Sequence, residues 1–356
     1  MWRKYQIVAK KHYLCGMERP KTANIVNADT PRVSVVICTY NGGKYLRDQL
    51  DSVIGQTCPL HEIIIQDDKS TDDTMTIAKE YAAHHTNIHI HVNTDVHGIN
   101  GNFFSAMKKA TGEYIAICDQ DDIWEPDKIS CQIQAIGDKL MCSCLSRPFS
   151  EDGSFVHYDS RVPNFNLYRL LFNNEIHGHT IVMNRRLLDR IPQEGLDEMC
   201  RLRIYDAILA ITAAAYDSIV FIDKALINHR RYQTAATYAS YDKCMPTVKN
   251  ALYILFWSIR HYSKVKKLTL PRELALLNYL QHLDNPSQVC AECIEITKLR
   301  ISDRFIDLIR LTLKYINHRF EIFHTKGKDP VNFLRAIQFP FTSLYYRRLL
   351  LNSSIK

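Results

Sequence analysis

Apolar runs and helical stretches alternate along the first third of the chain. The apolar runs, rich in Val, Ile and Ala, are typical of buried strands and lie at 32–40, 62–66, 88–92 and 113–118. Helices are predicted to begin near Gly43, after Ser70 or Thr71, and near Gly101. Strands that alternate with helices predict an α/β fold, Rossmann-like, with a mostly parallel sheet flanked by helices.

Polar side chains follow these strands at their carboxyl ends, where parallel sheets bind ligands. In Asp119-Gln120-Asp121-Asp122, three carboxylates lie within four residues. They repel one another unless a cation neutralises them, and such oxygen ligands suit Mg²⁺ or Mn²⁺. Alone, the run is equally compatible with an acidic turn that caps a helix starting near Pro126. Two further polar clusters, at 39–41 and 67–68, favour a shared crevice.

Three motifs occur in order along this part of the chain. They are VVICTYNG at 35–42, QDDKSTD at 66–72, and GEYI at 112–115 followed by DQDD at 119–122. In this order and at this spacing, they resemble family 2 glycosyltransferases with the GT-A fold over about residues 31–240. The run DQDDIW at 119–124 is most similar to the rhamnosyltransferase-like branch of that family.

The resemblance implies roles for individual residues. Side chains lining the nucleotide pocket would be Thr39, Tyr40 and Asn41. Asp68 would accept a hydrogen bond from a pyrimidine ring nitrogen of the donor. Asp121 would be the more direct ligand of Mg²⁺ or Mn²⁺, with Asp119 near the ribose and the metal. Gly98 and Asn102 fall in a segment that relatives place under the donor, although Asn102 could equally cap a helix.

The reaction that the resemblance implies is an inverting transfer, in which a carboxylate removes the proton of the attacking acceptor hydroxyl. Asp206 is the predicted base, with Asp197 and Glu198 as alternatives. Alternatively, Asp206 has no catalytic role and is a carboxylate near the start of a helix, where the helix dipole stabilises negative charge. A cation held by Asp121 would stabilise charge on the leaving nucleoside diphosphate, so no nucleophilic residue is required.

The chain departs from the family pattern after the last predicted strand. Many relatives carry Arg-x-His there, and the His completes the metal coordination, whereas this chain has Tyr232 at that position. Either His229 reaches the metal from a shifted register or water replaces the His, and we favour water because Mg²⁺ retains it readily. Arg230 and Arg231 suit a diphosphate, or each is a solvated surface charge.

Three other side chains have a functional and a structural interpretation. His177 and His179 match an acceptor-side segment and could contact sugar hydroxyls, although a histidine near an apolar strand is more often structural. Trp124 could stack on a sugar ring, but core packing is favoured.

Charge is distributed unevenly. The net charge is +7, but residues from Lys243 onward hold 19 Lys and Arg against 8 Asp and Glu, which leaves −4 for the first 242. We predict three parts: an N-terminal extension at 1–30, a GT-A domain at 31–242 and a basic, mostly helical C-terminal region at 243–356. An amphipathic helix is expected at 298–310, and the aromatic, basic segment 339–351 resembles interfacial segments. The region either contacts an anionic membrane or is a helical appendage with a solvated basic face.

Other properties limit location and partners. No apolar run reaches 18 residues, and the N-terminus lacks the apolar core of a secretory signal. Eleven Cys, an odd number, suit a reducing compartment. A cytoplasmic location is predicted, with peripheral contact at the inner face of the plasma membrane as an option. Nucleic acid is not an expected partner, because no recognised binding motif accompanies the basic charge.

Together these features predict a transferase that moves a hexosyl or deoxyhexosyl group from a dTDP- or UDP-sugar to a surface polysaccharide or lipid-linked glycan. Deoxythymidine-diphosphate rhamnose is one donor hypothesis and a uridine-diphosphate hexose the other. One alternative is a sugar nucleotidyltransferase, for which the loop at 41–44 is too short. The other is a non-catalytic nucleotide-sugar-binding module, which would tolerate loss of the carboxylates.

Overall fold

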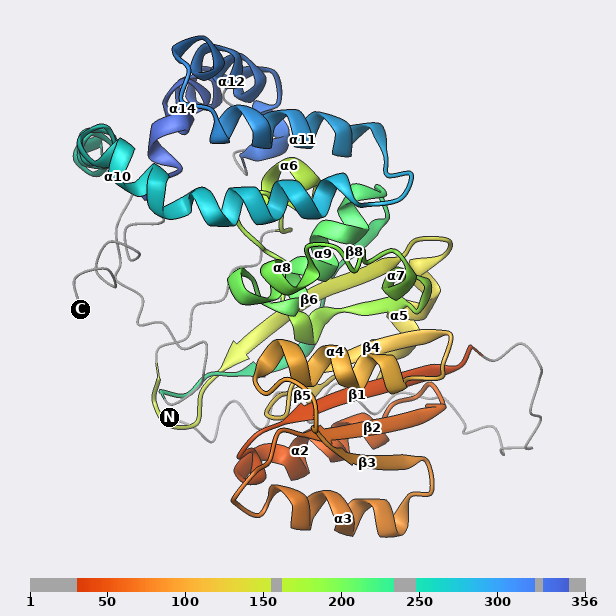
Figure 1. Ribbon diagram of the computed structural model, residues 1–356. Coiled ribbons are helices and arrows are strands. Elements are labelled where there is room, and N and C mark those ends of the chain that lie inside the picture. The colour runs from red at the N-terminus through yellow and green to blue at the C-terminus, as the bar shows by residue number, and fades with distance from the viewer. Residues whose placement is uncertain (1–30, 155–161, 234–247, 324–328, 346–356) are drawn as a thin grey trace, which may run out of the picture. The chain divides into compact units, whose positions relative to one another are not determined.

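A computed structural model describes residues 31–154, 162–233, 248–323 and 329–345 (Figure 1). The strands of these residues join one sheet in the order β3-β2-β1-β4-β7-β6-β8-β5. Their bounds are β1 (Val33–Thr39), β2 (Glu62–Asp67), β3 (Ile88–Val92), β4 (Tyr114–Cys118), β5 (Ile123–Trp124), β6 (Met141–Phe149), β7 (Val182–Asn184) and β8 (Ile219–Arg230).

Helices cover both faces of this sheet and continue beyond it. Those of the first part are α2 (Gly43–Ile54), α3 (Thr74–His84), α4 (Ile99–Lys109), α5 (Lys128–Ile136), α6 (Leu167–Leu170), the 3₁₀ turn η1 (Gly178–Thr180), α7 (Arg186–Asp189), α8 (Leu196–Leu202) and α9 (Tyr205–Ala215). Those of the C-terminal part are α10 (Val248–Gln281), α11 (Gln288–Ile301), α12 (Phe305–Asn317), α13 (Arg319–Ile322) and α14 (Asp329–Thr342).

The four strands predicted from the apolar runs form the parallel part of the sheet. Strand β1 pairs with β2 and β4, and β2 pairs with β3, all in parallel. Side chains alternate between the faces: Val36 and Ile117 join the core with α4 and α9, whereas Val35 and Ile63 join the core with α2 and α3. Because both of their faces are covered, β1 and β4 are almost entirely apolar, whereas the edge strand β3 alternates Ile with His and is partly exposed. The predicted α/β class is confirmed.

The remaining strands bring the end of β8 to the end of β4. Strand β7 lies between β4 and β6 and runs antiparallel to both. Strand β8 pairs in parallel with β6 and antiparallel with β5, where Trp124 lies opposite Ile227. Because β5 directly follows Asp119–Asp122, this pairing places those residues beside the end of β8. Trp124 is buried, in agreement with its predicted packing role.

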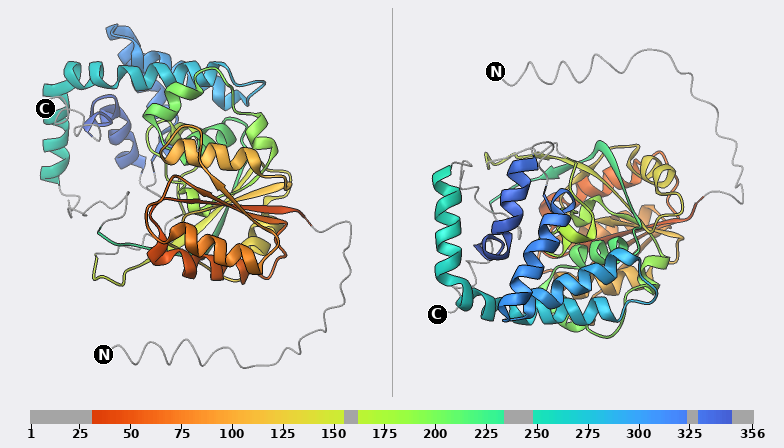
Figure 2. Two further views of the ribbon diagram at one scale, coloured as in Figure 1. Left: turned by 60° about the horizontal axis from the view of Figure 1, so that its bottom comes forward. Right: turned by 90° about the horizontal axis from the view of Figure 1, so that it is seen from above.

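The C-terminal helices share one core with α9. Figure 2 shows the blue helices of this region beside the green helices that precede them. The hydroxyls of Thr212 and Tyr279 lie 2.6 Å apart, and the Ser287 amide donates to the carbonyl of Ala215. The predicted helical character of this region is confirmed. The proposed extension 1–30 and the boundary near residue 242 lie outside the described residues. Within the described part of the chain, no helix has the length and apolarity needed to cross a bilayer.

The prediction of one helix over 298–310 is wrong. Helix α11 ends at Ile301, and Ser302 adopts an extended conformation with ψ of 141°. The Ser302 hydroxyl donates to the Asp307 carboxylate at 2.6 Å, so a polar side chain contact holds the break between α11 and α12. The segment 339–351 is helical as far as Thr342, and its last residues, from 346, are not described.

Gly112, in the turn between α4 and β4, tests how closely this turn packs against the start of β1. A Cβ at this position would lie 2.6 Å from Ser34 Oγ and 2.7 Å from the carbonyl oxygen of Arg32. We expect Gly112→Ala to lower the free energy of unfolding by roughly 1–3 kcal/mol, because backbone atoms must move to make room. Gly55→Ala is the control, since its Cβ would come no closer than 3.1 Å to another atom. Equal denaturation midpoints for the two variants would contradict this packing.

Candidate active site

The polar clusters at the ends of β1, β2 and β4 lie at one edge of the sheet. The Gln120 side chain accepts a hydrogen bond from the Tyr40 amide at 2.9 Å and donates to the Tyr40 carbonyl at 3.1 Å. Gly42 leaves room for this contact, because a Cβ there would lie 2.2 Å from Gln120 Oε1. The loop after β1 is therefore tied to the acidic loop after β4.

Of the three residues predicted to line a nucleotide pocket, Tyr40, at 60%, and Asn41 are exposed, whereas Thr39 is buried. The buried Thr39 hydroxyl donates to Asp67 at 2.8 Å. Asn41 has a left-handed backbone, with φ of 48°, and its side chain accepts a hydrogen bond from the Thr71 amide. Thr39 and Asn41 thus shape the loops, and Tyr40 presents its ring at the surface.

Asp68 is held at the end of β2 by a set of donors. Its carboxylate accepts hydrogen bonds from Asn93 at 2.7 Å, His97 at 2.9 Å and the Gly98 amide at 2.8 Å. Burial raises the pKa of Asp68, but these hydrogen bonds outweigh burial and lower it overall. Asp68 is therefore an ionised acceptor at the surface of the crevice.

Asn102 does not cap a helix, so that interpretation is wrong. The cap position of α4 is Gly98, and Asn102 lies in the first turns. Its buried side chain donates to the carbonyls of Gln66 at 3.1 Å and Thr39 at 3.4 Å. It binds α4 to the ends of β1 and β2.

Asp121 and Asp119 lie in an environment that disfavours their negative charge. Burial, followed by the charges of Asp122 and Asp119, raises the pKa of Asp121 to about 7, against a lowering contribution from the Tyr232 hydroxyl 2.6 Å away. Burial likewise raises the pKa of Asp119, although its side chain is 35% exposed and His229 partly offsets the shift. A bound cation would relieve both effects.

Asp122 is a third carboxylate of the site that sequence reasoning did not assign. It is fully buried, and its Oδ1 accepts hydrogen bonds from His229 Nδ1 at 3.0 Å and the Arg230 amide at 2.9 Å. Its Oδ2 has no hydrogen-bond partner, and His179 Nδ1 lies 3.8 Å from it. In the sequence Asp122 is the third Asp of DQDD, and it was not assigned because a D-x-D pattern includes only the first two.

Ligand atoms of Asp122, His179 and His229 lie within 4.8 Å of one another and could hold a metal. Burial keeps His179 neutral by lowering its pKa well below the usual value, and neutral imidazole is the form that binds metals. The two rings are stacked, however, with centroids 4.5 Å apart and planes 9° from parallel. The nitrogen lone pairs of two parallel imidazole rings do not point at one common position. One of the two rings would therefore have to rotate before both could bind the same ion.

The donors present fit a hard divalent cation. Asp119 and Asp121 offer carboxylate oxygens beside the unpartnered oxygen of Asp122, and Mg²⁺ or Mn²⁺ prefers such ligands. The carboxylates suit the ion without any ring movement. His229 is turned toward Asp122, and this contact raises its pKa despite burial.

The residues after β8 surround this cluster. Tyr232, at the position of the family His, donates its hydroxyl to Asp121. Arg230 is buried and pairs with Asp48 at 2.8 Å and with Glu151, and its Nε donates to the Asp121 carbonyl. To contact a diphosphate, Arg230 would have to release one of these carboxylates. Arg231 lies beside His229.

Asp206 lies in the first turn of α9 and faces η1. Its carboxylate accepts a hydrogen bond from the Ala207 amide at 2.6 Å, with further hydrogen bonds from Gly178 and Asn174. Burial, together with the charge of Asp119, raises its pKa to about 6 against these hydrogen bonds. The charge of Asp119 thus contributes to the raised pKa of both Asp206 and Asp121.

Asn100 positions the start of α9. Its side chain donates to the carbonyls of Cys200 and Arg203, and its oxygen accepts a hydrogen bond from the Tyr205 amide at 2.7 Å. Sequence reasoning missed it, because its partners are about 100 residues away. The alternative bases Asp197 and Glu198 are exposed on α8.

The two predicted acceptor histidines differ in exposure. His177 is exposed, whereas His179 is buried and lies 3.5 Å from Asp119 through its Nδ1. Their rings stack with centroids 5.7 Å apart. His177 is thus open to solvent, whereas His179 lies against the Asp119 and Asp122 carboxylates.

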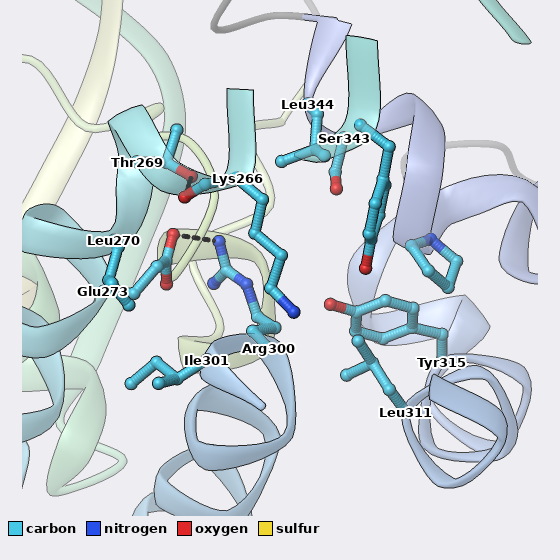
Figure 3. Close-up of a pocket in the computed structure, with 12 residues that line it drawn as sticks. Lys266, Thr269, Leu270, Glu273, Arg300, Ile301, Leu311, Tyr315, Ser343 and Leu344 are labelled. Atoms are coloured by element: carbon cyan, nitrogen blue, oxygen red, sulfur yellow. Dashed lines mark hydrogen bonds and ion pairs between the residues drawn. The ribbon is translucent and has the colours of Figure 1, made fainter. Parts of the chain in front are cut away.

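A separate cavity lies among α10, α11, α12 and the residues after α14 (Figure 3). Glu273 and Arg300 form an ion pair of 2.5 Å in its wall, and Tyr315 points into it. Its volume is about 30 Å³, and since one water needs about 10–15 Å³ by this measure, it has room for about two waters. It is too small for a sugar nucleotide.

Comparison with known proteins identifies the family. The model of glycosyl transferase family 2 matches residues 34–191. The putative teichuronic acid biosynthesis glycosyltransferase TuaG of Bacillus subtilis is 31% identical over 176 residues, which are 49% of this chain and 68% of TuaG. This chain belongs to glycosyltransferase family 2.

Other relatives extend the comparison. The uncharacterized protein Rv1520 of Mycobacterium tuberculosis is 29% identical over 223 residues, which cover 59% of this chain and 61% of that protein. Among solved structures, S. aureus TarS in complex with UDP-GlcNAc is similar over 89% of this chain and 92% of that chain, with 16% identity and a TM-score of 0.47. The family 2 match includes Asp68, Asp119 and Asp121 and ends before Asp206.

The raised pKa of Asp121 predicts how this family 2 member binds Mn²⁺. Because the carboxyl must lose its proton to ligate, affinity should rise about tenfold per pH unit up to about pH 7 and then level off. Tyr232→Phe removes a hydrogen bond that lowers this pKa, so the plateau should move to higher pH. Mn²⁺ titrations from pH 5.5 to 8.5 measure both effects.

Tyr81→Phe is the matched control for that experiment. The Tyr81 hydroxyl also donates to a carboxylate, that of Asp51 at 2.6 Å, but away from the site. A pH-independent affinity, or the same shift in both variants, would contradict the assignment of Asp121.

Proposed function

We propose that this chain is an inverting, metal-dependent glycosyltransferase that transfers a sugar from a nucleotide-sugar donor to a hydroxyl of a surface polysaccharide or lipid-linked glycan. The observation that carries the proposal is the acidic loop after β4, in which the charge of Asp119 helps to raise the pKa of both Asp121 and Asp206. It combines a cation site with a carboxylate of raised pKa, the two elements that such a transfer requires. Family membership and the polysaccharide named in the TuaG description support it.

The donor would lie between the ends of β1, β2 and β4. Asp68 accepts a hydrogen bond from the base, and the exposed Tyr40 ring offers a surface for stacking. Asp121, with Asp119, would hold Mg²⁺ or Mn²⁺, which acts as a Lewis acid on the leaving diphosphate when bound. Cys38, at the end of β1, experiences the charges of both Asp119 and Asp68, in keeping with one continuous site.

The acceptor would approach from the side of α9 and η1. Asp206, with a pKa of about 6, is mostly ionised at neutral pH and takes the proton of the attacking hydroxyl. The hydroxyl oxygen forms a bond to the anomeric carbon, and the bond from this carbon to the diphosphate, on the opposite face of the sugar, breaks. No enzyme nucleophile takes part. Exposed His177 is placed to hydrogen-bond a sugar hydroxyl.

The finer assignments are part of the same proposal. A thymidine or uridine diphosphate is the proposed leaving group, because Asp68 suits a pyrimidine ring N–H. Rhamnose and a hexose are the donor sugars to compare. The acceptor is proposed to be a glycan assembled at the cytoplasmic face of the membrane.

A thermal-shift panel tests this function directly. Nucleoside diphosphates and nucleotide sugars are compared with and without Mn²⁺, because a ligand that binds the native state raises apparent stability. Stabilisation by a pyrimidine diphosphate that requires Mn²⁺ is expected. Absence of any shift across pyrimidine and purine diphosphates would overturn the proposal.

Asp121→Asn should abolish metal-dependent turnover of the donor. Loss of the charge that holds the cation is expected to lower kcat/KM by on the order of 10²–10³, with little effect on folding. Donor hydrolysis or transfer at saturating Mn²⁺ is the measurement. Asp73→Asn, an exposed carboxylate before α3, is the control and should retain activity. Wild-type turnover of Asp121→Asn would refute its role.

Asp206→Asn should stop transfer and stabilise the fold. The rate should fall by roughly 10²–10⁴ while donor binding persists. A carboxyl whose pKa rises on folding destabilises the native state once it ionises, so this cost is absent below the unfolded pKa and complete above about pH 6. The variant should therefore gain about 1–3 kcal/mol at pH 7 and nothing at pH 3.5.

Asp197→Asn and Glu198→Gln serve as controls for the base. Both residues are exposed on α8, and both variants should keep transfer activity and stability. Transfer that survives Asp206→Asn but fails in one of these variants would reassign the base.

A further inference from the structure

Exposed apolar side chains are concentrated on the C-terminal helices. Of the 20 large hydrophobic side chains that are exposed among the described residues, 14 lie beyond residue 247. Single exposed apolar residues are normal, but a concentration of this kind marks an interaction surface.

Helix α12 has the clearest unpartnered apolar stripe. Its buried residues Asp307, Leu311 and Tyr315 follow one another at four-residue spacing and face the core. Phe305, Ile309 and Leu313 also follow at four-residue spacing but are offset by two residues, which rotates them to the other side of the helix. Phe305 is 76% exposed, more than any other large hydrophobic side chain in the described ranges.

Two neighbouring helices have the same property. The exposed apolar residues of α10 are Leu252, Tyr253, Phe256, Ile259 and, further along the helix, Leu274, and those of α14 are Val331, Phe333, Leu334 and Ile337. Helix α14 packs on both α10 and α12, so the three stripes belong to one group of helices. In each helix the core uses one face and leaves an apolar face uncovered.

Basic residues flank the α12 stripe. Arg304 and Arg310 have side chains that are 73% and 62% exposed, and both lie near the Asp307 carboxylate, at 3.7 Å and 3.3 Å, which neutralises only one of the two charges. The chain from Lys243 onward carries an excess of 11 positive charges. A second copy would bring the same charge to the interface, whereas an anionic bilayer neutralises it and takes up the apolar side chains.

We propose that α12 lies in the interface of an anionic membrane, with Phe305, Ile309 and Leu313 inserted among the acyl chains and Arg304 and Arg310 at the lipid phosphates. The inference deepens the proposed function, because a lipid-linked acceptor would be met at this surface, but vesicle binding itself does not depend on catalysis. It assigns the membrane contact to a described helix, whereas the sequence pattern pointed to segment 339–351.

Vesicle co-sedimentation of the full chain tests this surface. Vesicles of phosphatidylcholine with phosphatidylglycerol are compared with phosphatidylcholine alone, at low and high salt. Binding should require the anionic lipid and weaken with salt. The double variant Phe305→Ser and Ile309→Ser should bind vesicles on the order of tenfold more weakly than the wild type, since two apolar side chains no longer insert.

Val162→Ser is the control, because Val162 is an exposed apolar residue outside the C-terminal helices. It should bind vesicles like the wild type, and all proteins should bind nucleoside diphosphate with Mn²⁺ equally. Light scattering is measured in parallel. Equal vesicle binding by the double variant, or loss of a dimer without any vesicle binding by the wild type, would overturn the proposal. Vesicle binding without nucleotide binding would instead count against the proposed function.

Discussion

The crowding of three carboxylates at the end of β4 is the interaction on which the site depends. Asp119, Asp121 and Asp122 follow a strand that is buried on both faces, so they cannot spread apart into solvent. His229 and the Arg230 amide satisfy one oxygen of Asp122, which leaves its second oxygen and the other two carboxylates to repel one another. Water does not screen this repulsion well in a partly buried site. A proton or a cation relieves it, and this repulsion adds to burial, the larger cause, in raising the pKa of Asp121.

The rest of the sheet edge holds this arrangement in place. Gln120 clamps the acidic loop to the loop after β1, and Asn102 ties α4 to the ends of β1 and β2. Asn100 fixes the start of α9, so Asp206 stays near enough to Asp119 to experience its charge. The two carboxylate groups are thus coupled through a scaffold of side chain to backbone hydrogen bonds. Such bonds suit a site whose geometry must persist while ligands exchange.

Local patterns were sufficient to predict the parallel half of the fold. The apolar runs of β1 to β4 are long and bounded by turn residues, and the acidic run after β4 is distinctive in any context. Short β7 and β5 gave no such signal, because their pairing is set by partners about 70 to 100 residues away.

The same limit applies to the site. Asp119 and Asp121 were recognisable as candidate ligands, but the burial of Asp122, the pairing of Arg230 with Asp48 and the role of Asn100 depend on tertiary contacts. The break at Ser302 was missed because a serine hydroxyl outweighs an otherwise continuous amphipathic pattern.

The central claim is that one cation at Asp121 joins the donor diphosphate to this edge of the sheet. The most direct measurement is the anomalous scattering of Mn²⁺ in crystals grown with uridine or thymidine diphosphate. We predict one strong manganese peak at the Asp121 carboxylate, in contact with the diphosphate, and the base beside Asp68. A nucleotide bound elsewhere, or manganese at the Asp119–Asp122 loop with no diphosphate on it in the presence of saturating nucleotide, would contradict the account.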